Sequence, residues 1–251
     1  MVEETWAARC LRWKQEWDPL ADQGTDDSQG VDLYSVIHAL SDALTEHDIV
    51  MTDAGSPSYA LPVSLKAKAA NQFIFSPSQA DMGWALPASV GAAKAAPGRP
   101  ITVVIGDGSF YSNMQELAVI MHHALPIRIV VLNNDGYLSI RNTQTKYFEG
   151  RVYGVDTGTG LTFPPLAQVA RAFGMEHARL SNLNELRGNL AQLMHWSDGP
   201  MIIEIMCMRE QEIRPSQAFK ILPDGSRIQA PLHDMHPFMD TEEMAREWPR
   251  S

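Results

Sequence analysis

The sequence has few cysteines, an excess of acidic over basic residues, and no long apolar run. Its 251 residues include two cysteines, Cys10 near the N-terminus and Cys207 in an apolar run. Two such cysteines make neither a disulfide framework nor a metal-ligand spacing, so we expect a reducing, cytoplasmic setting. With 30 acidic and 20 basic residues the net charge is -10, so no nucleic-acid partner is expected. No segment approaches the roughly 20 apolar residues of a membrane span, and no signal peptide is recognisable at the N-terminus, so no membrane association is expected.

Short apolar runs alternate with helical patterns along most of the chain. Several of the runs are rich in β-branched residues and are too short for buried helices, which favours strands. The alternation predicts an α/β fold, a doubly wound and mostly parallel sheet with helices on both faces. Strands are predicted at 48–52, 72–75, 101–105, 127–132, 177–180 and 201–206, and helices at about 33–44, 85–96, 114–123, 165–173 and 183–195.

Three segments are expected along the chain. Residues 1–30 form an N-terminal appendage that ends in the polar, turn-rich linker 22–30. Residues 31–210 form the main α/β domain. Residues 211–251 are rich in proline, which predicts an irregular tail that wraps the domain or meets a partner.

The most informative motif follows the strand predicted at 101–105. It consists of Gly106, Asp107, Gly108 and Ser109 and leads into a helix. Glycines at the carboxyl end of a buried strand allow the backbone to approach a ligand, and the amides of the loop and of the helix can bind an anion. A carboxylate beside a phosphate is repulsive unless a cation lies between them, so Asp107 predicts Mg²⁺ or Ca²⁺ in a diphosphate site.

A second motif, Asn133-Asn134-Asp135-Gly136-Tyr137, follows after an interval of about two dozen residues that holds one crossover helix and one parallel strand. The two loops should therefore emerge side by side, with Asn134 and Asp107 sharing the cation. The carbonyl of Gly136 is the expected further metal ligand. Each motif alone is a common turn, and together they are far more specific.

Both motifs at this interval resemble the signature of thiamine diphosphate (ThDP)-dependent enzymes. From about residue 31 onward the chain resembles the C-terminal cofactor domain of the acetohydroxyacid synthase and pyruvate decarboxylase group, which identifies 31–210 as a ThDP diphosphate-binding domain. Further landmarks of the resemblance occur in order: TDAG at 52–55, DMGWALPA at 81–88, QEL at 115–117 and LPI at 125–127.

The resemblance implies ThDP and Mg²⁺ as cofactors and assigns roles by position. Met82 corresponds to the residue that holds ThDP in its bent shape, although a methionine alone is more often core packing. The carbonyl of Ala80 corresponds to the acceptor for the aminopyrimidine. Gly55 and Ser56 align with the loop that covers the diphosphate, where the synthase branch has a Gln-His pair instead of Ser56-Pro57. Tyr137 begins a segment, 137–160, that either closes over the cofactor or is a solvated loop.

The resemblance also implies a partner. In this family the glutamate that activates ThDP lies on a pyrimidine-binding domain of a neighbouring subunit, so no catalytic residue is expected in this chain. We expect a partner subunit that supplies this glutamate, in a hetero-oligomer such as a dimer of heterodimers. It is open whether that partner binds FAD.

The residues 134–150 look most like those of carboligases. Such an enzyme decarboxylates a 2-oxo acid such as pyruvate and transfers the two-carbon unit to a carbonyl acceptor, keto sugars included. The alternatives are the subunit of a simple 2-oxo acid decarboxylase, a transketolase half, and a non-catalytic regulator that binds ThDP.

Overall fold

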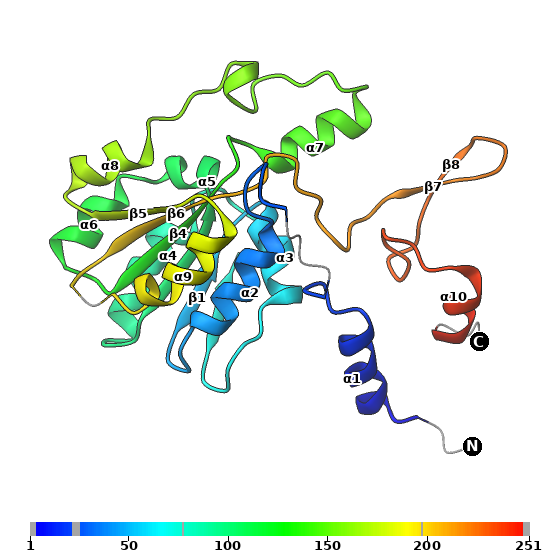
Figure 1. Ribbon diagram of the computed structural model, residues 1–251, viewed down its shortest axis with the longest axis horizontal. Helices are drawn as coiled ribbons and strands as arrows, with labels where there is room; N and C mark the ends of the chain where they lie inside the picture. Colours follow the sequence, from blue (N-terminus) through cyan, green and yellow to red (C-terminus); the bar gives the residue numbers. More distant parts are fainter. Residues whose placement is uncertain (1–3, 22–25, 77, 197, 248–251) are drawn as a thin grey trace. The chain divides into compact units, whose positions relative to one another are not determined.

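The computed structural model describes residues 4–21, 26–76, 78–196 and 198–247 (Figure 1). The chain forms two compact units, Met1–Gln211 and Glu212–Ser251. Residues 22–25 of the expected linker lie outside the described residues. No helix within the described ranges is long and apolar enough to cross a membrane.

The first unit is built on a six-stranded sheet in the order β2-β1-β3-β4-β6-β5, and every neighbouring pair is parallel. The predicted fold class is confirmed, and each predicted strand is found with its ends shifted by at most one residue. The strands are β1 (Ile49–Thr52), β2 (Gln72–Phe75), β3 (Ile101–Gly106), β4 (Ile127–Asn133), β5 (Glu176–Leu180) and β6 (Met201–Met206).

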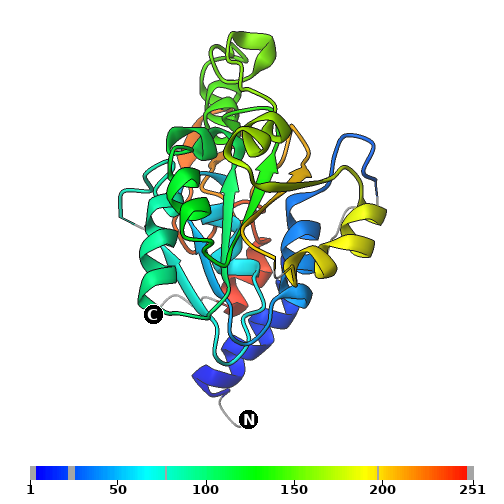
Figure 2. The same ribbon diagram turned by 90° about the vertical axis from the view of Figure 1, so that its left-hand side faces the viewer.

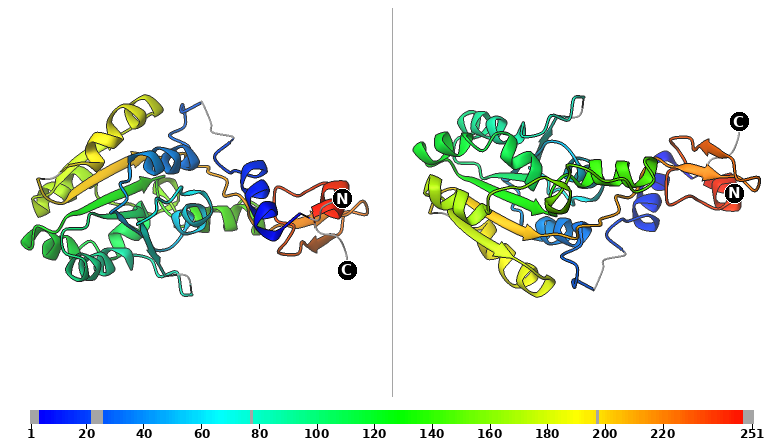
Figure 3. Two further views of the ribbon diagram at one scale, coloured as in Figure 1. Left: turned by 90° about the horizontal axis from the view of Figure 1, so that it is seen from below. Right: turned by 90° about the horizontal axis from the view of Figure 1, so that it is seen from above.

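Helices cover both faces of this sheet (Figures 2 and 3). On one face α2 packs against α9 and α3, and on the other α4 packs against α6, which also contacts α8. Their bounds are α2 (Leu33–Ala43), α3 (Ser56–Ser64), α4 (Ala85–Ala95), α5 (Asp107–Ser112), α6 (Glu116–His122), α7 (Leu138–Tyr147), α8 (Leu166–Phe173) and α9 (Leu183–Met194), with a short 3₁₀ helix at Thr157–Thr159.

The central strands are buried on both faces, which explains their nearly continuous apolar sequence. In β3, Ile101, Val103 and Ile105 point to a core cluster together with Phe110 of α5 and Leu117 of α6, and all five side chains are fully buried. Burial of this kind contributes roughly 1.5–3 kcal/mol per large side chain. The sheet is therefore a rigid base for the loops at its ends.

The strand order reverses between β1 and β3, because the chain passes from β1 to β2 on one side and returns to β3 on the other. Loops that leave the carboxyl ends of strands on either side of such a point diverge and leave a crevice, where open α/β sheets bind ligands. Both motifs identified in the sequence follow strands at this edge, after β3 and after β4.

A buried ion pair joins three strands near the opposite edge. Arg128, near the start of β4, lies 2.6 Å from Asp48, the residue before β1. Asp48 also accepts hydrogen bonds from Thr102 of β3 at 3.1 Å and from the hydroxyl and amide of Thr45. Both charged side chains are less than one-tenth exposed, so each depends on the other for its stabilisation.

The two ends of the chain are more structured than the sequence predicted. The N-terminal segment contains helix α1 (Trp6–Glu16), which begins at the N-cap Thr5. The C-terminal unit was expected to be irregular, but it contains a hairpin of β7 (Phe219–Ile221) and β8 (Arg227–Gln229) and the helix α10 (Thr241–Glu247). Strands of three residues carry too little pattern to be recognised in a sequence.

The Asp48 and Arg128 pair predicts a large stability effect. D48A leaves a buried guanidinium without its counter-charge and should reduce the unfolding free energy by about 3–5 kcal/mol. Adding R128M to D48A removes the uncompensated charge and should recover part of that loss. Urea denaturation of the two variants tests this, and a double variant less stable than D48A would contradict it.

Candidate cofactor and metal site

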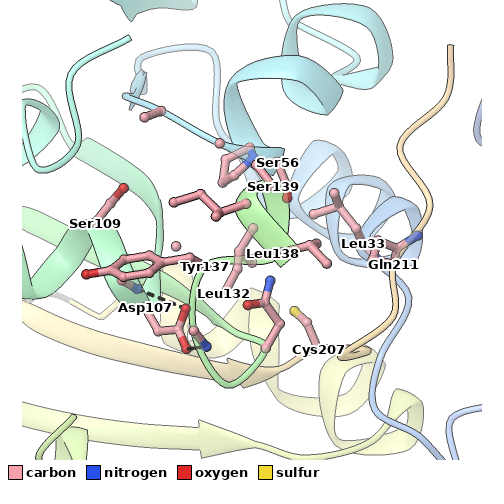
Figure 4. Close-up of a pocket in the computed structure, with 18 of the residues that line it drawn as sticks. Leu33, Ser56, Asp107, Ser109, Leu132, Tyr137, Leu138, Ser139, Cys207 and Gln211 are labelled. Carbon is pink, nitrogen blue, oxygen red and sulfur yellow. Dashed lines mark hydrogen bonds between the residues drawn. The ribbon is translucent and has the colours of Figure 1, made fainter. Parts of the chain in front are cut away.

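All eleven residues predicted from the sequence line one pocket at the carboxyl edge of the sheet (Figure 4). The cavity measures about 240 Å³. The loops after β1, β2, β3 and β4 each contribute to its wall. The eleven are Gly55, Ser56, Ala80, Met82, Gly106, Asp107, Gly108, Ser109, Asn134, Gly136 and Tyr137.

Asp107 lies at the start of α5 and is 3% exposed. Its Oδ1 accepts a hydrogen bond from the amide of Gly108 at 2.9 Å, and its Oδ2 accepts one from the amide of Gly136 at 2.8 Å (Figure 4). Burial raises the pKa of Asp107 to about 6, although these two hydrogen bonds act to lower it. The carboxylate is thus fixed in orientation but poorly solvated, a state that a bound cation would stabilise.

Asn134 follows β4 and is 8% exposed. Its Oδ1 is buried without a hydrogen-bond partner, although buried acceptors are normally paired. An unpaired amide oxygen that lines the same pocket as a buried carboxylate suits a hard cation such as Mg²⁺ or Ca²⁺. Among the described residues no group of three or more His, Cys, Asp or Glu side chains is placed to hold a metal ion.

Gly108, in the loop after β3, and Gly136, in the loop after β4, have no room for a side chain. A Cβ on Gly108 would lie 2.4 Å from the ring of Tyr137, and a Cβ on Gly136 would lie 2.0 Å from the carbonyl oxygen of Val155. Gly136 also has a φ of 120°, which side chains rarely adopt. Its carbonyl, the predicted metal ligand, accepts a 3.2 Å hydrogen bond from Leu138 and retains a second lone pair.

Gly55 and Ser56 lie where α3 begins, beside the pocket. Gly55 is the N-cap of the helix, with a φ of 75° and no side chain to cap the first turn. Ser56 is buried. A helix N-terminus without a side-chain cap is favourable for an anionic group, which is the role expected for this loop.

Ala80 and Met82 belong to the loop after β2. Ala80 has a φ of 52°, the left-handed conformation in which glycine is favoured, so the backbone here has the form that a glycine would allow. Met82 is 37% exposed although it lines the pocket, which excludes ordinary core packing, the alternative considered for this side chain.

Asp53 was not among the predicted site residues, although TDAG was recognised as a motif. Its fully buried carboxylate accepts hydrogen bonds from the amide of Ala54 at 2.6 Å and from that of Gly83 at 2.8 Å. It therefore ties the loop that carries Met82 to the end of β1. Burial raises the pKa of Asp53 to about 6, despite these hydrogen bonds.

Comparison with known proteins gives a consistent result. The model of the thiamine pyrophosphate enzyme C-terminal TPP binding domain matches residues 53–205, more than half of the chain. The acetolactate synthase large subunit of Lactococcus lactis is 30% identical over 66% of this chain and 28% of its own length. The large subunit of acetolactate synthase isozyme 2 of Escherichia coli is 29% identical over 85% of this chain and 38% of its own length.

A more distant relative, the probable acetolactate synthase large subunit of Methanocaldococcus jannaschii, is 26% identical over 90% of this chain and 37% of its own length. The chain thus spans less than two fifths of each of these three relatives.

The pKa of Asp53 predicts how stability changes with pH. The folded state binds the proton of the Asp53 carboxyl group more tightly than the unfolded state does. Protonated Asp53 therefore stabilises the fold fully below its ordinary pKa of 3.8, and this contribution is lost as the pH rises through about 6. The unfolding free energy of the wild type minus that of D53N should fall by about 2–3 kcal/mol from about pH 4 to about pH 7. Urea denaturation at each pH measures it, and a difference that increases with pH would contradict it.

Proposed function

The chain belongs to the thiamine pyrophosphate enzymes through their C-terminal TPP binding domain, and on this basis we propose that it is the diphosphate-binding subunit of a two-component ThDP-dependent carboligase. The observation that carries the proposal is the pair of buried oxygens at the ends of β3 and β4, the fixed carboxylate of Asp107 and the unpaired Oδ1 of Asn134. When bound, ThDP supplies the electron sink for decarboxylation of a 2-oxo acid.

In the proposed site Asp107, Asn134 and the carbonyl of Gly136 hold Mg²⁺, and the cation neutralises the diphosphate. Magnesium requires oxygen ligands in near-octahedral geometry, and these three groups leave positions for phosphate oxygens and water. Ser109, in the first turn of α5, lines the same pocket and would contact the diphosphate. The chain's net charge of -10 makes such local neutralisation necessary.

The mouth of the pocket supports a partner at this surface. Three large apolar side chains line the pocket yet remain exposed, Tyr59 at 60%, Ile140 at 44% and Met82 at 37%. Apolar side chains grouped at a site mark surfaces that another protein or a ligand covers. The cavity of about 240 Å³ is also smaller than the roughly 300–1,000 Å³ usual for small-molecule sites, so this unit would enclose only part of the cofactor.

The activating glutamate would come from the partner. Asp107 is the only carboxylate among the described residues that line the pocket, and its two oxygens already face the loop amides. We propose that a pyrimidine-domain subunit covers the mouth and supplies the glutamate, in a hetero-oligomer such as a dimer of heterodimers. Because the relatives are acetolactate synthases, we propose pyruvate as the donor. A carbonyl compound such as a keto sugar is the proposed acceptor.

Metal-dependent cofactor binding tests the role of Asn134. N134A should weaken Mg²⁺-supported ThDP binding by at least about tenfold, because loss of a residue that merely supports a metal ligand already costs roughly 10–100-fold. Calorimetry of the full chain with ThDP, with and without Mg²⁺, measures this. N142A is the matched control, since Asn142 donates to the carbonyl of Gln211 and lies outside the pocket. Equal affinities of N134A and N142A would contradict the assignment.

Turnover tests the need for a partner. The full chain with pyruvate, ThDP and Mg²⁺ should release no CO₂, and addition of the polypeptide that co-purifies with it should restore release. A carbonyl acceptor should then give a product longer by two carbons. Turnover by this chain alone would contradict the two-component proposal. Decarboxylation without carboligation would instead identify a simple decarboxylase, and ThDP binding without turnover in any combination would identify a regulator.

A further inference from the structure

The loop that would carry two of the metal ligands has an unusual backbone. Asp135 and Gly136 both have positive φ, at 61° and 120°. An aspartate rarely adopts positive φ, so contacts around Asp135 must hold this conformation, whereas Gly136 adopts it at no steric cost. The contacts around the loop should therefore explain why Asn134 and Gly136 lie where they do.

Arg141 of α7 makes two of these contacts, and the side chains of Asn133, Asp107, Thr157 and Arg209 make others. Arg141 is 2% exposed, and its Nη2 donates to the carbonyl of Asn134 at 3.1 Å while its Nη1 donates to that of Asp135 at 3.3 Å. Its guanidinium also donates to the carbonyl of Arg209 at 2.6 Å. The buried guanidinium of Arg141 thus binds two successive carbonyls of the loop that follows β4.

The charge of Arg141 is balanced by Asp156, whose carboxylate lies 3.3 Å from Nη1 and is 1% exposed. Asp156 is itself held by Arg209 and by the hydroxyl of Thr159, at 2.8 Å from the latter. Exposed Glu210 lies 3.6 Å from the Nε of Arg141. The groups that hold Arg141 therefore lie in the loops after β6 and after α7, and none of these four residues lines the pocket itself.

These contacts fix the orientation of the loop. With the carbonyls of Asn134 and Asp135 bound to Arg141, the next amide, that of Gly136, donates to Asp107 at 2.8 Å. Arg141 does not line the pocket itself, so it acts through the backbone of the loop.

We propose that Arg141 is a positioning residue that gives the metal site its preference for Mg²⁺ over Ca²⁺, by holding Asn134 and Gly136 in a fixed geometry. The inference rests on the proposed function. Magnesium requires near-ideal octahedral ligands at about 2.0–2.1 Å, whereas calcium accepts irregular ligands at about 2.3–2.6 Å. A rigid loop therefore favours the smaller ion, and a loosened loop should lose more affinity for magnesium than for calcium.

R141K tests the inference. Lysine keeps the charge, but it is a single ammonium on a flexible stem and cannot reproduce the planar fork that serves two carbonyls. The affinity of the full chain for ThDP, measured by calorimetry, should fall about tenfold with saturating Mg²⁺ and less than about threefold with saturating Ca²⁺. D156N should shift the ratio in the same direction, because it removes the charge that anchors Arg141 while the arginine remains.

R128K is the matched control. Arg128 is the other arginine in a buried ion pair among the described residues, and it lies near the opposite edge of the sheet against Asp48. R128K should lower the melting temperature and leave the ratio of Mg²⁺-supported to Ca²⁺-supported affinity unchanged. An equal loss with both metals in R141K and D156N would overturn the inference and leave the proposed function intact. A wild-type chain that binds ThDP with neither metal, even together with the polypeptide that co-purifies with it, would overturn the proposed function itself.

Discussion

The hydrogen bond from the amide of Gly136 to the carboxylate of Asp107 joins the two loops on which the site depends. It is possible because β3 and β4 are parallel neighbours, paired from Ile101 and Ile127 to Gly106 and Leu132, so that both strands end at the same edge. The pairing register therefore determines which residues of the two loops meet. A shift of one residue would turn the side chains of the shifted strand to the other face of the sheet and bring other loop residues together.

This arrangement has an electrostatic cost that the fold itself does not remove. Asp53 and Asp107 follow neighbouring strands, and burial raises the pKa of both to about 6. Each carboxylate accepts hydrogen bonds from backbone amides, and burial outweighs them, so its negative charge remains incompletely compensated. For Asp107 a metal ion would supply the missing charge, and for Asp53 the backbone bonds serve to hold the loop that carries Met82.

The strands and most helices of the first unit were predictable because buried parallel strands need continuous apolar runs, as in Ile127–Asn133. The site was predictable because short motifs follow those strands directly. Arg141 and Asp53 were missed as site residues because they act on backbone groups, and the sequence does not show which carbonyls or amides a side chain will reach. The β7-β8 hairpin was missed because its strands have three residues each, too few to show a pattern. Helix α1 was missed although Trp6, Cys10, Trp13 and Trp17 follow a helical spacing, because its many charged residues suggested an appendage.

The buried arginines show how the same residue type serves two purposes on one sheet. Arg128 joins strands through Asp48 near the amino ends, where the chain needs only stability. Arg141 binds carbonyls of the loop near the carboxyl ends, where Asp135 has a positive φ that is uncommon for an aspartate and where a ligand is expected. A buried ion pair is a weak source of stability in itself. The Arg141 and Asp156 pair beside Asn134 is therefore better explained by the loop conformation that it fixes than by its contribution to the free energy of unfolding.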